Sequence, residues 1–164
     1  MATRMSTRKS WREKLEKPGE REVTVLSDEK AQRMGGRRLL IPTPLDVDAA
    51  IRQIPAGKVA TTRSLAGYLA HRYDADVTCP LCTGIFVRIA AEAAAEDERA
   101  GRDGVTPFWR VVGPDGRLNE KLPGGVESQA RRLEAEGHAL APAAGKRPPR
   151  VADLAGALAD LTEV

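Results

Sequence analysis

The stretch Thr106-Pro107-Phe108-Trp109-Arg110-Val111-Val112, followed by Gly113-Pro114-Asp115-Gly116, is the most informative part of this sequence. Two bulky rings stand side by side behind a stiff proline and ahead of an arginine, an arrangement that suits a flat ligand with a π face. The two valines predict a short buried strand, and Pro114-Asp115-Gly116 predicts a tight turn. The alternative from this stretch alone is that Phe108 and Trp109 belong to the core.

Length and composition point to one domain with tails. The 164 residues are 41% hydrophobic but only 4% aromatic, so the core is expected to consist of Ala, Val, Leu and Ile. The formal net charge is +3, which permits nucleic-acid binding without demanding it. Residues 1–40 hold 11 Lys and Arg against 6 Asp and Glu, whereas residues 41–164 hold 15 against 17. The excess positive charge therefore lies in the N-terminal arm.

Targeting signals are not evident. The two cysteines do not make a disulfide framework, so a reducing compartment is expected. No apolar run approaches the length of a membrane span, and no apolar stretch follows the basic residues at the N-terminus. We expect a cytoplasmic protein that makes no contact with a membrane.

Residues 1–43 are interpreted as a basic N-terminal arm. Ser10 can cap a short helix over residues 11–16, which the pair Pro18-Gly19 would end. The arm is either disordered, or extended along phosphates, or anchored to the domain through Trp11. Short extended segments are expected over residues 23–26 and 37–41.

Residues 44–140 carry the compact part. Apolar spacing predicts helices over residues 45–53, capped by Thr43 or Asp46, and over 62–73, capped by Thr61 or Thr62. A third helix is expected over residues 84–99 with Thr83 as its cap. Its predicted inner face comprises Ile85, Phe86, Ile89, Ala90 and Ala93.

The rest of the chain follows the short strand and turn. A helix is expected over residues 126–136, ended by Gly137. Helix, turn, helix, short strand and tight turn follow one another in the order of a winged helix-turn-helix, so the fold class is mainly α with short β. Residues 141–164 are read as a linker over 141–150 and an amphipathic helix over 151–161.

Three pieces of this sequence together resemble one family. They are residues 54–61 (IPAGKVAT) with Ser64-Leu65-Ala66, then Pro107-x-x-Arg110-Val111-Val112 with Asp115-Gly116, then Gly125 and Gln129 with residues 133–137 (LEAEG). This pattern is similar to the DNA-binding domain of the methylated-DNA–protein-cysteine methyltransferases, which repair 6-O-alkylguanine. The resemblance covers residues 44–140 and implies the winged helix-turn-helix of that domain.

The resemblance also shows a substitution at the reactive position. The family motif reads Pro-Cys-His-Arg-Val, in which the cysteine accepts the alkyl group and the histidine activates it. Phe108 stands at the cysteine and Trp109 at the histidine, and neither side chain can be alkylated or move a proton in this way. The chain therefore resembles the alkyltransferase-like proteins, which bind alkylated guanine and pass the lesion to other repair proteins. This implies a non-enzymatic partner of double-stranded DNA without a cofactor.

The resemblance implies where DNA or the flipped base would contact the protein. Thr62 stands where the family has a tyrosine that contacts phosphate, and Thr83-Gly84 stand where it has an intercalating arginine before a small residue. Small Gly84, Val87 and Ala91 would let the third helix approach a minor groove while Arg88 contacts phosphate. The base would stack on Phe108 and Trp109, and Glu136 would accept the indole N–H or cap structure. The full expected set is Thr62, Arg63, Ser64, Thr83, Gly84, Arg88, Phe108, Trp109, Arg110, Val111, Asn119, Gly125 and Glu136.

The acidic run Glu92, Glu96, Asp97 and Glu98 at the far end of the third helix bears on this geometry. Those carboxylates would repel DNA if they faced the duplex.

Cys79 and Cys82 permit different chemistry. Cys-x-x-Cys is a redox spacing, and thiols before a helix have lowered pKa values, so a redox pair or relocated nucleophile is one alternative. With His71 and His138 the pair could also form a four-ligand zinc site. The plain interpretation is two structural thiols. A third class of function is a winged-helix interaction module that binds DNA without lesion specificity.

Overall fold

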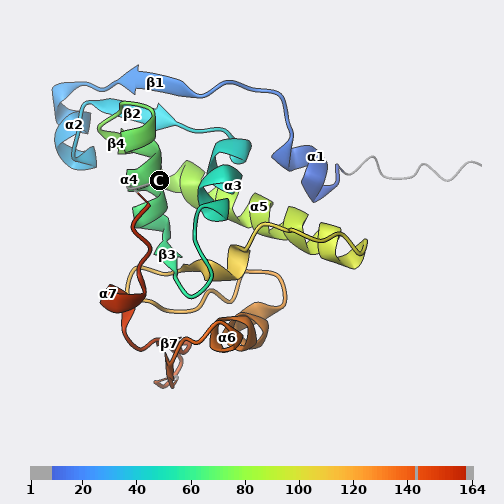
Figure 1. The fold of residues 1–164 in the computed structure, drawn as a ribbon. Coiled ribbons are helices and arrows are strands. Elements are labelled where there is room, and N and C mark those ends of the chain that lie inside the picture. The colour runs from blue at the N-terminus through green and yellow to red at the C-terminus, as the bar shows by residue number, and fades with distance from the viewer. Residues whose placement is uncertain (1–8, 143, 162–164) are drawn as a thin grey trace, which may run out of the picture.

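The computed structural model describes residues 9–142 and 144–161, and it is mainly helical with short strands (Figure 1). This confirms the fold class expected from the sequence. The helices are α1 (Trp11–Leu15), α2 (Asp28–Met34), α3 (Pro44–Arg52), α4 (Thr62–Arg72), α5 (Pro80–Arg99), α6 (Gly125–Ala135), α7 (Leu154–Ala157) and the 3-10 turn η1 (Phe108–Arg110). The strands are β1 (Glu22–Val25), β2 (Arg38–Ile41), β3 (Ala60–Thr61), β4 (Val77–Thr78), β5 (Val111–Val112), β6 (Leu140–Ala141) and β7 (Arg150–Val151).

Helices α3, α4 and α5 pack together around the main core. Thr43 and Thr61 each begin a helix with a capping box, in which the threonine and the residue three positions later exchange hydrogen bonds with each other's backbone N–H groups. The inner face of α5 is built from small side chains, which lets neighbouring helices approach closely. Its core members include Ala90, Ala91, Ala93 and Ala94.

The short parallel pair β3–β5 places the start of α4 beside the segment that follows the two rings. Ala60 pairs with Val111 and Thr61 with Val112. Both valines are buried, as the sequence predicted, and Val112 joins a second apolar cluster with Val59, Leu118, Leu133 and Val151. The β-turn after β5 is present.

The predicted start of the third helix is wrong by four residues. Helix α5 begins at Pro80, whose fixed φ suits the first helical position, and Cys79 is its N-cap. Thr83 is therefore inside the helix, where its hydroxyl donates to the Cys79 carbonyl at 2.8 Å. Ile85, expected on the inner face, is 49% exposed instead.

The N-terminal arm is attached to the domain over its described part. Ser10 caps α1 as predicted, Leu15 is buried, and α1 packs along α5. Of the alternatives, anchoring through α1 is therefore the one realised; residues 1–8 lie outside the described residues. Strand β1 pairs antiparallel with β2, and β2 pairs parallel with β4.

Helix α2 was not predicted. It buries no side chain, so it has no apolar periodicity to detect. Its ends do carry signals, because Ser27 is the N-cap and Gly35 closes the helix with φ of 85°.

The predicted C-terminal helix over residues 151–161 is mostly wrong. Val151 belongs to the antiparallel pair β6–β7, and only Leu154–Ala157 are helical. Leu158 forms a bridge with Val59, and Leu161 is buried in the main core. The apolar residues are thus buried by pairing with distant strands, which overrides their helical spacing. At the two ends of the expected linker, Leu140–Ala141 and Arg150–Val151 instead pair as antiparallel strands.

Candidate nucleic-acid interface

The ring of Phe108 is part of the core. Its side chain is 2% exposed, and the Trp109 ring meets it edge to face at a centroid distance of 5.5 Å and an angle of 77°. Trp109 itself is half-buried. Arg132 from α6 lies over both rings, 5.3 Å from the Phe108 centroid and 4.5 Å from that of Trp109. The two rings are therefore already engaged by packing and by a guanidinium.

Glu136 fastens this segment to the rest of the domain. It accepts the Trp109 indole N–H, and its two oxygens accept from Arg110 Nε at 3.0 and 2.9 Å. Arg110 Nη1 also donates to the Ile54 carbonyl at 2.7 Å. Both roles left open for Glu136 are present, since it accepts the indole proton and also holds Gly57 N–H at 3.4 Å. Arg110 is thus committed to an internal ion pair.

Gln129 ties the loop after β5 to the same segment. Its amide nitrogen donates to the carbonyls of Trp109 and Val111 at 3.0 and 2.9 Å. Its amide oxygen accepts from the Asn119 backbone N–H at 2.8 Å. The side chain is 2% exposed, so a single buried amide fixes where Asn119 stands.

A groove of about 580 Å³ runs along the first half of α5, and we call it the α5 groove. It lies between α5, the start of α4, the loop that carries Asn119, and α1. Its walls combine apolar side chains with cations. It is lined by Trp11, Lys14, Thr62, Pro80, Leu81, Gly84, Ile85, Val87, Arg88, Ile89, Asn119, Lys121 and Leu122.

The α5 groove brings together four of the residues expected to contact DNA, namely Thr62, Gly84, Arg88 and Asn119. They come from three segments that are distant in the sequence. Gly84 is exposed and has no atom within 4 Å of the position that a Cβ would take, so a ligand can approach the backbone there. Phe108 does not line this groove. It lines a separate hollow of about 310 Å³ with Arg132 and Gly124.

Comparison with known families gives a direct result. The model of the 6-O-methylguanine DNA methyltransferase DNA-binding domain matches residues 43–138, which is more than half of the chain. The chain belongs to this family.

A solved structure supports the fold of this family member. The S. pombe Atl1 protein, crystallised in complex with damaged DNA containing O6-carboxymethylguanine, matches with a TM-score of 0.51 and 19% identity. The match covers 71% of this chain and 94% of that one. Comparison with curated proteins gave no match. At this identity the likeness shows the fold, and position 108 of this family member is Phe where the family motif has cysteine.

Other expected contact residues of this family member lie elsewhere. Thr83 and Ala91 are fully buried, so these two cannot meet a minor groove in this conformation. Val87 is also buried, but it lines the α5 groove. Ser64 is used in the α4 capping box. Arg63 is exposed on the other side of the α4 start, where it lines a second hollow of about 580 Å³.

Val111 lies near the turn after β5. Together with Asn119, which also lines the α5 groove, and with Arg117 and Lys146, it lines a hollow of about 310 Å³. Gly125 is the first residue of α6.

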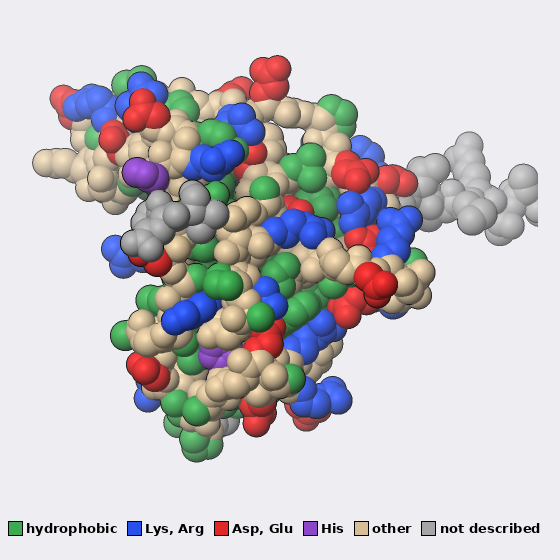
Figure 2. Space-filling view, viewed as in Figure 1, with side chains coloured by type: hydrophobic (Ala, Val, Ile, Leu, Met, Phe, Trp, Pro, Cys, Tyr) green, Lys and Arg blue, Asp and Glu red, His purple; other side chains and the backbone are tan. Residues whose placement is uncertain are grey.

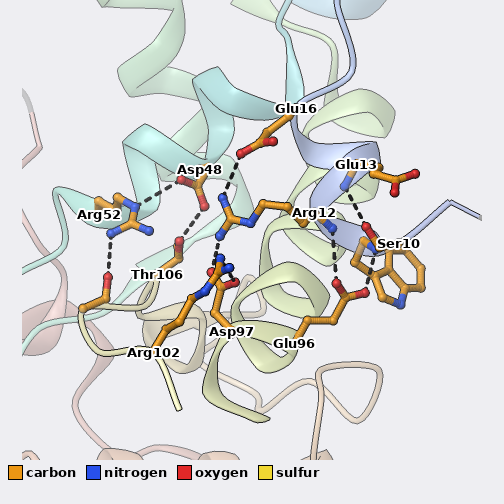
Figure 3. Close-up of polar contacts among 12 residues, drawn as sticks. Ser10, Arg12, Glu13, Glu16, Asp48, Arg52, Glu96, Asp97, Arg102 and Thr106 are labelled. Carbon is orange, nitrogen blue, oxygen red and sulfur yellow. Dashed lines mark hydrogen bonds and ion pairs between the residues drawn. The ribbon is translucent and has the colours of Figure 1, made fainter. Parts of the chain in front are cut away.

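Three of the four carboxylates at the acidic end of α5 have partners within the molecule, and Figure 3 shows two of them, Glu96 and Asp97. Glu96 accepts the backbone N–H of Trp11 at 2.6 Å, and Asp97 pairs with Arg12 and Arg102. Glu98 pairs with Arg132 at 2.8 Å. These carboxylates therefore hold α1 and α6 in place. Across the face in Figure 2, basic and acidic side chains are interspersed rather than segregated.

The two thiols lie at the start of α5. Cys79 Sγ accepts the Cys82 backbone N–H at 3.3 Å, and both thiols are free and half-buried. Burial, together with the hydrogen bond to Cys79, raises the pKa of the Cys82 thiol to about 11. No three His, Cys, Asp or Glu side chains converge within residues 9–142 and 144–161, so this structure does not bring Cys79, Cys82, His71 and His138 together. In the same part of the chain, no helix is both long and apolar enough to cross a bilayer.

Sequence reasoning missed several residues of the α5 groove. Trp11 and Lys14 lie outside the family match, while Lys121 and Leu122 lie in a loop without periodicity. The available signal was Trp11, the only aromatic residue of the N-terminal arm, followed three residues later by Lys14 in a helix that Ser10 can cap.

Proposed function

We propose that this protein binds duplex DNA along the α5 groove and recognises guanine alkylated at the 6-oxygen after the nucleotide flips out, without accepting the alkyl group. In this role it would present the lesion to downstream repair proteins. Membership of the methyltransferase DNA-binding family supports DNA as the partner. The fold likeness to Atl1, which is bound to damaged DNA in that structure, agrees with it.

The observation that carries the proposal is the composition of the α5 groove. Its volume of about 580 Å³ lies within the range of ligand sites, and its apolar wall includes Ile89 and Leu122. Arg88 and Lys121 are exposed beside this wall and suit phosphates. An apolar slot flanked by cations matches a base joined to its phosphate backbone.

Energetics favour the damaged base. Flipping costs a few kcal/mol, and the cost is lower for a base whose pairing is weakened. Alkylation of the 6-oxygen weakens pairing and adds apolar surface, which gains from burial in the groove. Both effects favour the lesion over plain guanine.

Position 108 argues against alkyl transfer. A phenyl ring has no nucleophilic atom, and here it is buried in the core. A thiol enzyme using Cys82 is opposed by a pKa of about 11, which leaves little thiolate at neutral pH. Binding without lesion specificity remains the competing function, and no feature of the groove favours it over recognition.

The test is a fluorescence-anisotropy titration of labelled duplexes that differ only by 6-O-methylguanine in place of one guanine. We expect tighter binding of the lesion duplex, affinity that falls steeply with salt, and no mass gain on the protein afterwards. Arg88→Ala should weaken binding to both duplexes. Arg131→Ala is the matched control, because Arg131 is exposed on α6 and does not line the groove.

Equal affinity for the two duplexes would reject lesion recognition in favour of general DNA binding. A mass increase of one methyl group would instead show that the protein is an alkyl acceptor. Equal losses in Arg88→Ala and Arg131→Ala would move the interface away from the α5 groove.

A further inference from the structure

Helix α1 contributes to the α5 groove although it lies outside the family match. Trp11 and Lys14 line the groove beside residues of α5 and the Asn119 loop. All six aromatic side chains of the protein lie in the described part of the chain, and Trp11 alone among them lines this groove. The ring is half-buried, so part of its surface is accessible.

The rings at positions 108 and 109 are poorly placed to stack on a base. Phe108 is 2% exposed and Arg132 lies over its ring. The indole of Trp109 is tethered to Glu136 and also lies beneath Arg132, which Glu98 holds in place through an ion pair. Neither ring lines the α5 groove.

The helix that carries Trp11 is held firmly in its place. The Trp11 backbone N–H donates to Glu96 at 2.6 Å, and the neighbouring Arg12 pairs with Asp97 (Figure 3). Leu15, on the same helix, is buried. A ring carried by a segment that is already ordered avoids the entropy cost of ordering that segment on binding. Glu96 and Asp97, at the acidic end of α5, therefore anchor the helix that carries the Trp11 ring.

Cations lie next to the same ring. Lys14 Nζ is 4.0 Å from its centroid, and Arg88 lies 5.9 Å away. Both cations can leave the Trp11 ring and contact a DNA phosphate instead, because a phosphate anion attracts a cation more strongly than the face of an aromatic ring does. Such an exchange would free the indole face where a nucleobase lies.

We propose that Trp11 is the stacking platform for the flipped base, so that α1 supplies the aromatic wall of the lesion site. The inference rests on the proposed function, because it assumes that a base enters the α5 groove. The ligand is a purine base of duplex DNA, and Lys14 contacts its flanking phosphate.

The experiment compares full-length Trp11→Leu and Trp11→Phe in the paired duplex titration. Leucine keeps an apolar side chain but removes the π face, whereas phenylalanine keeps both. We expect Trp11→Leu to lose about tenfold in affinity for the 6-O-methylguanine duplex and much less for the plain one. The affinity of Trp11→Phe for the lesion duplex should stay within about threefold of the wild-type affinity, because phenylalanine can still stack on a base.

Fluorescence gives a second measurement that does not depend on altering Trp11. In Trp109→Phe the sole tryptophan is Trp11, and its emission should be quenched more by the lesion duplex than by the plain duplex. In Trp11→Phe the emission of Trp109 should respond equally to both. Far-UV circular dichroism checks that each variant is folded.

The outcomes separate the two ideas. The stacking role alone is overturned if three results coincide: the wild type prefers the lesion duplex, Trp11→Leu keeps the full preference, and the emission of Trp11 does not change. A wild type without lesion preference overturns the proposed function and this inference together.

Discussion

Replacing Glu136 by glutamine tests whether its carboxylate is a structural fastener. Glu136 and Arg110 are only 14% and 16% exposed in their side chains, and they pair at 2.9 Å. Glutamine keeps the size of the side chain and one acceptor oxygen. The neutral amide cannot balance the charge of Arg110, which then keeps only the Ile54 carbonyl as a strong acceptor. The amide oxygen can still accept the Trp109 indole N–H.

The magnitude follows from these contacts. Removing one member of a buried ion pair costs about 3–5 kcal/mol, and a hydrogen bond to a charged group contributes about 1.5–3 kcal/mol. Because glutamine retains one acceptor and the pair is slightly exposed, we expect a loss of about 2–3 kcal/mol in unfolding free energy. With a urea slope of roughly 2 kcal/mol per molar, the midpoint falls by about 1 M.

The assay is urea unfolding followed by circular dichroism at 222 nm. Glu134→Gln is the matched control, since it makes the same substitution at an exposed site on α6 and should change stability by less than about 0.5 kcal/mol. A double-mutant cycle with Arg110→Met isolates the pair energy. DNA affinity should be unchanged in the folded variant, because Glu136 does not line the α5 groove.

Two results would refute this reasoning. The first is a Glu136→Gln variant as stable as Glu134→Gln, which would mean that the ion pair contributes nothing. The second is unchanged stability together with a lost preference for 6-O-methylguanine, which would assign the carboxylate to base recognition.

Two further predictions concern the core ring and the thiol. Phe108→Ala should lower the free energy of unfolding by about 3–5 kcal/mol, and Phe108→Leu by far less, because the ring is buried. The leucine variant should keep its preference for the lesion duplex; if a stably folded Phe108→Leu lost that preference, the base would stack on Phe108 instead. For Cys82, the two-unit rise in pKa from its ordinary 9 to about 11 predicts alkylation by iodoacetamide roughly 100-fold slower at pH 8 in the folded protein than in urea. Its contribution to stability is complete below pH 9 and is lost as the pH rises through 11. Equal rates in the folded and unfolded protein, followed by intact mass, would contradict the burial.

The sequence was most reliable where signals are local. Thr43 and Thr61 each begin a helix because a hydroxyl can accept a backbone N–H three residues on. Gly137 follows the last helical turn with φ of 94°, which only glycine adopts easily. The family motif likewise depends on contiguous residues, and the match over residues 43–138 confirms it.

The sequence failed where distant partners compete with local preference. The apolar residues after position 150 are spaced for a helix, yet Leu158 is paired with Val59 and Val151 with Leu140. Helix α2 has no buried face, so periodicity could not detect it. In both cases the information lay in residues far away along the chain or in the end caps.

The chain alone determined the family, the winged fold and the absence of a reactive side chain at position 108, because each depends on residue type at fixed spacing. Only the tertiary structure decided which aromatic ring meets the groove. Phe108 stands at the family's reactive position and Trp109 follows it, but Phe108 is buried and Trp109 contacts Glu136 and Arg132. Trp11 reaches the groove because Glu96 and Asp97, some 85 residues later, hold its helix against α5. Contacts over such a separation arise from packing, which no local pattern encodes.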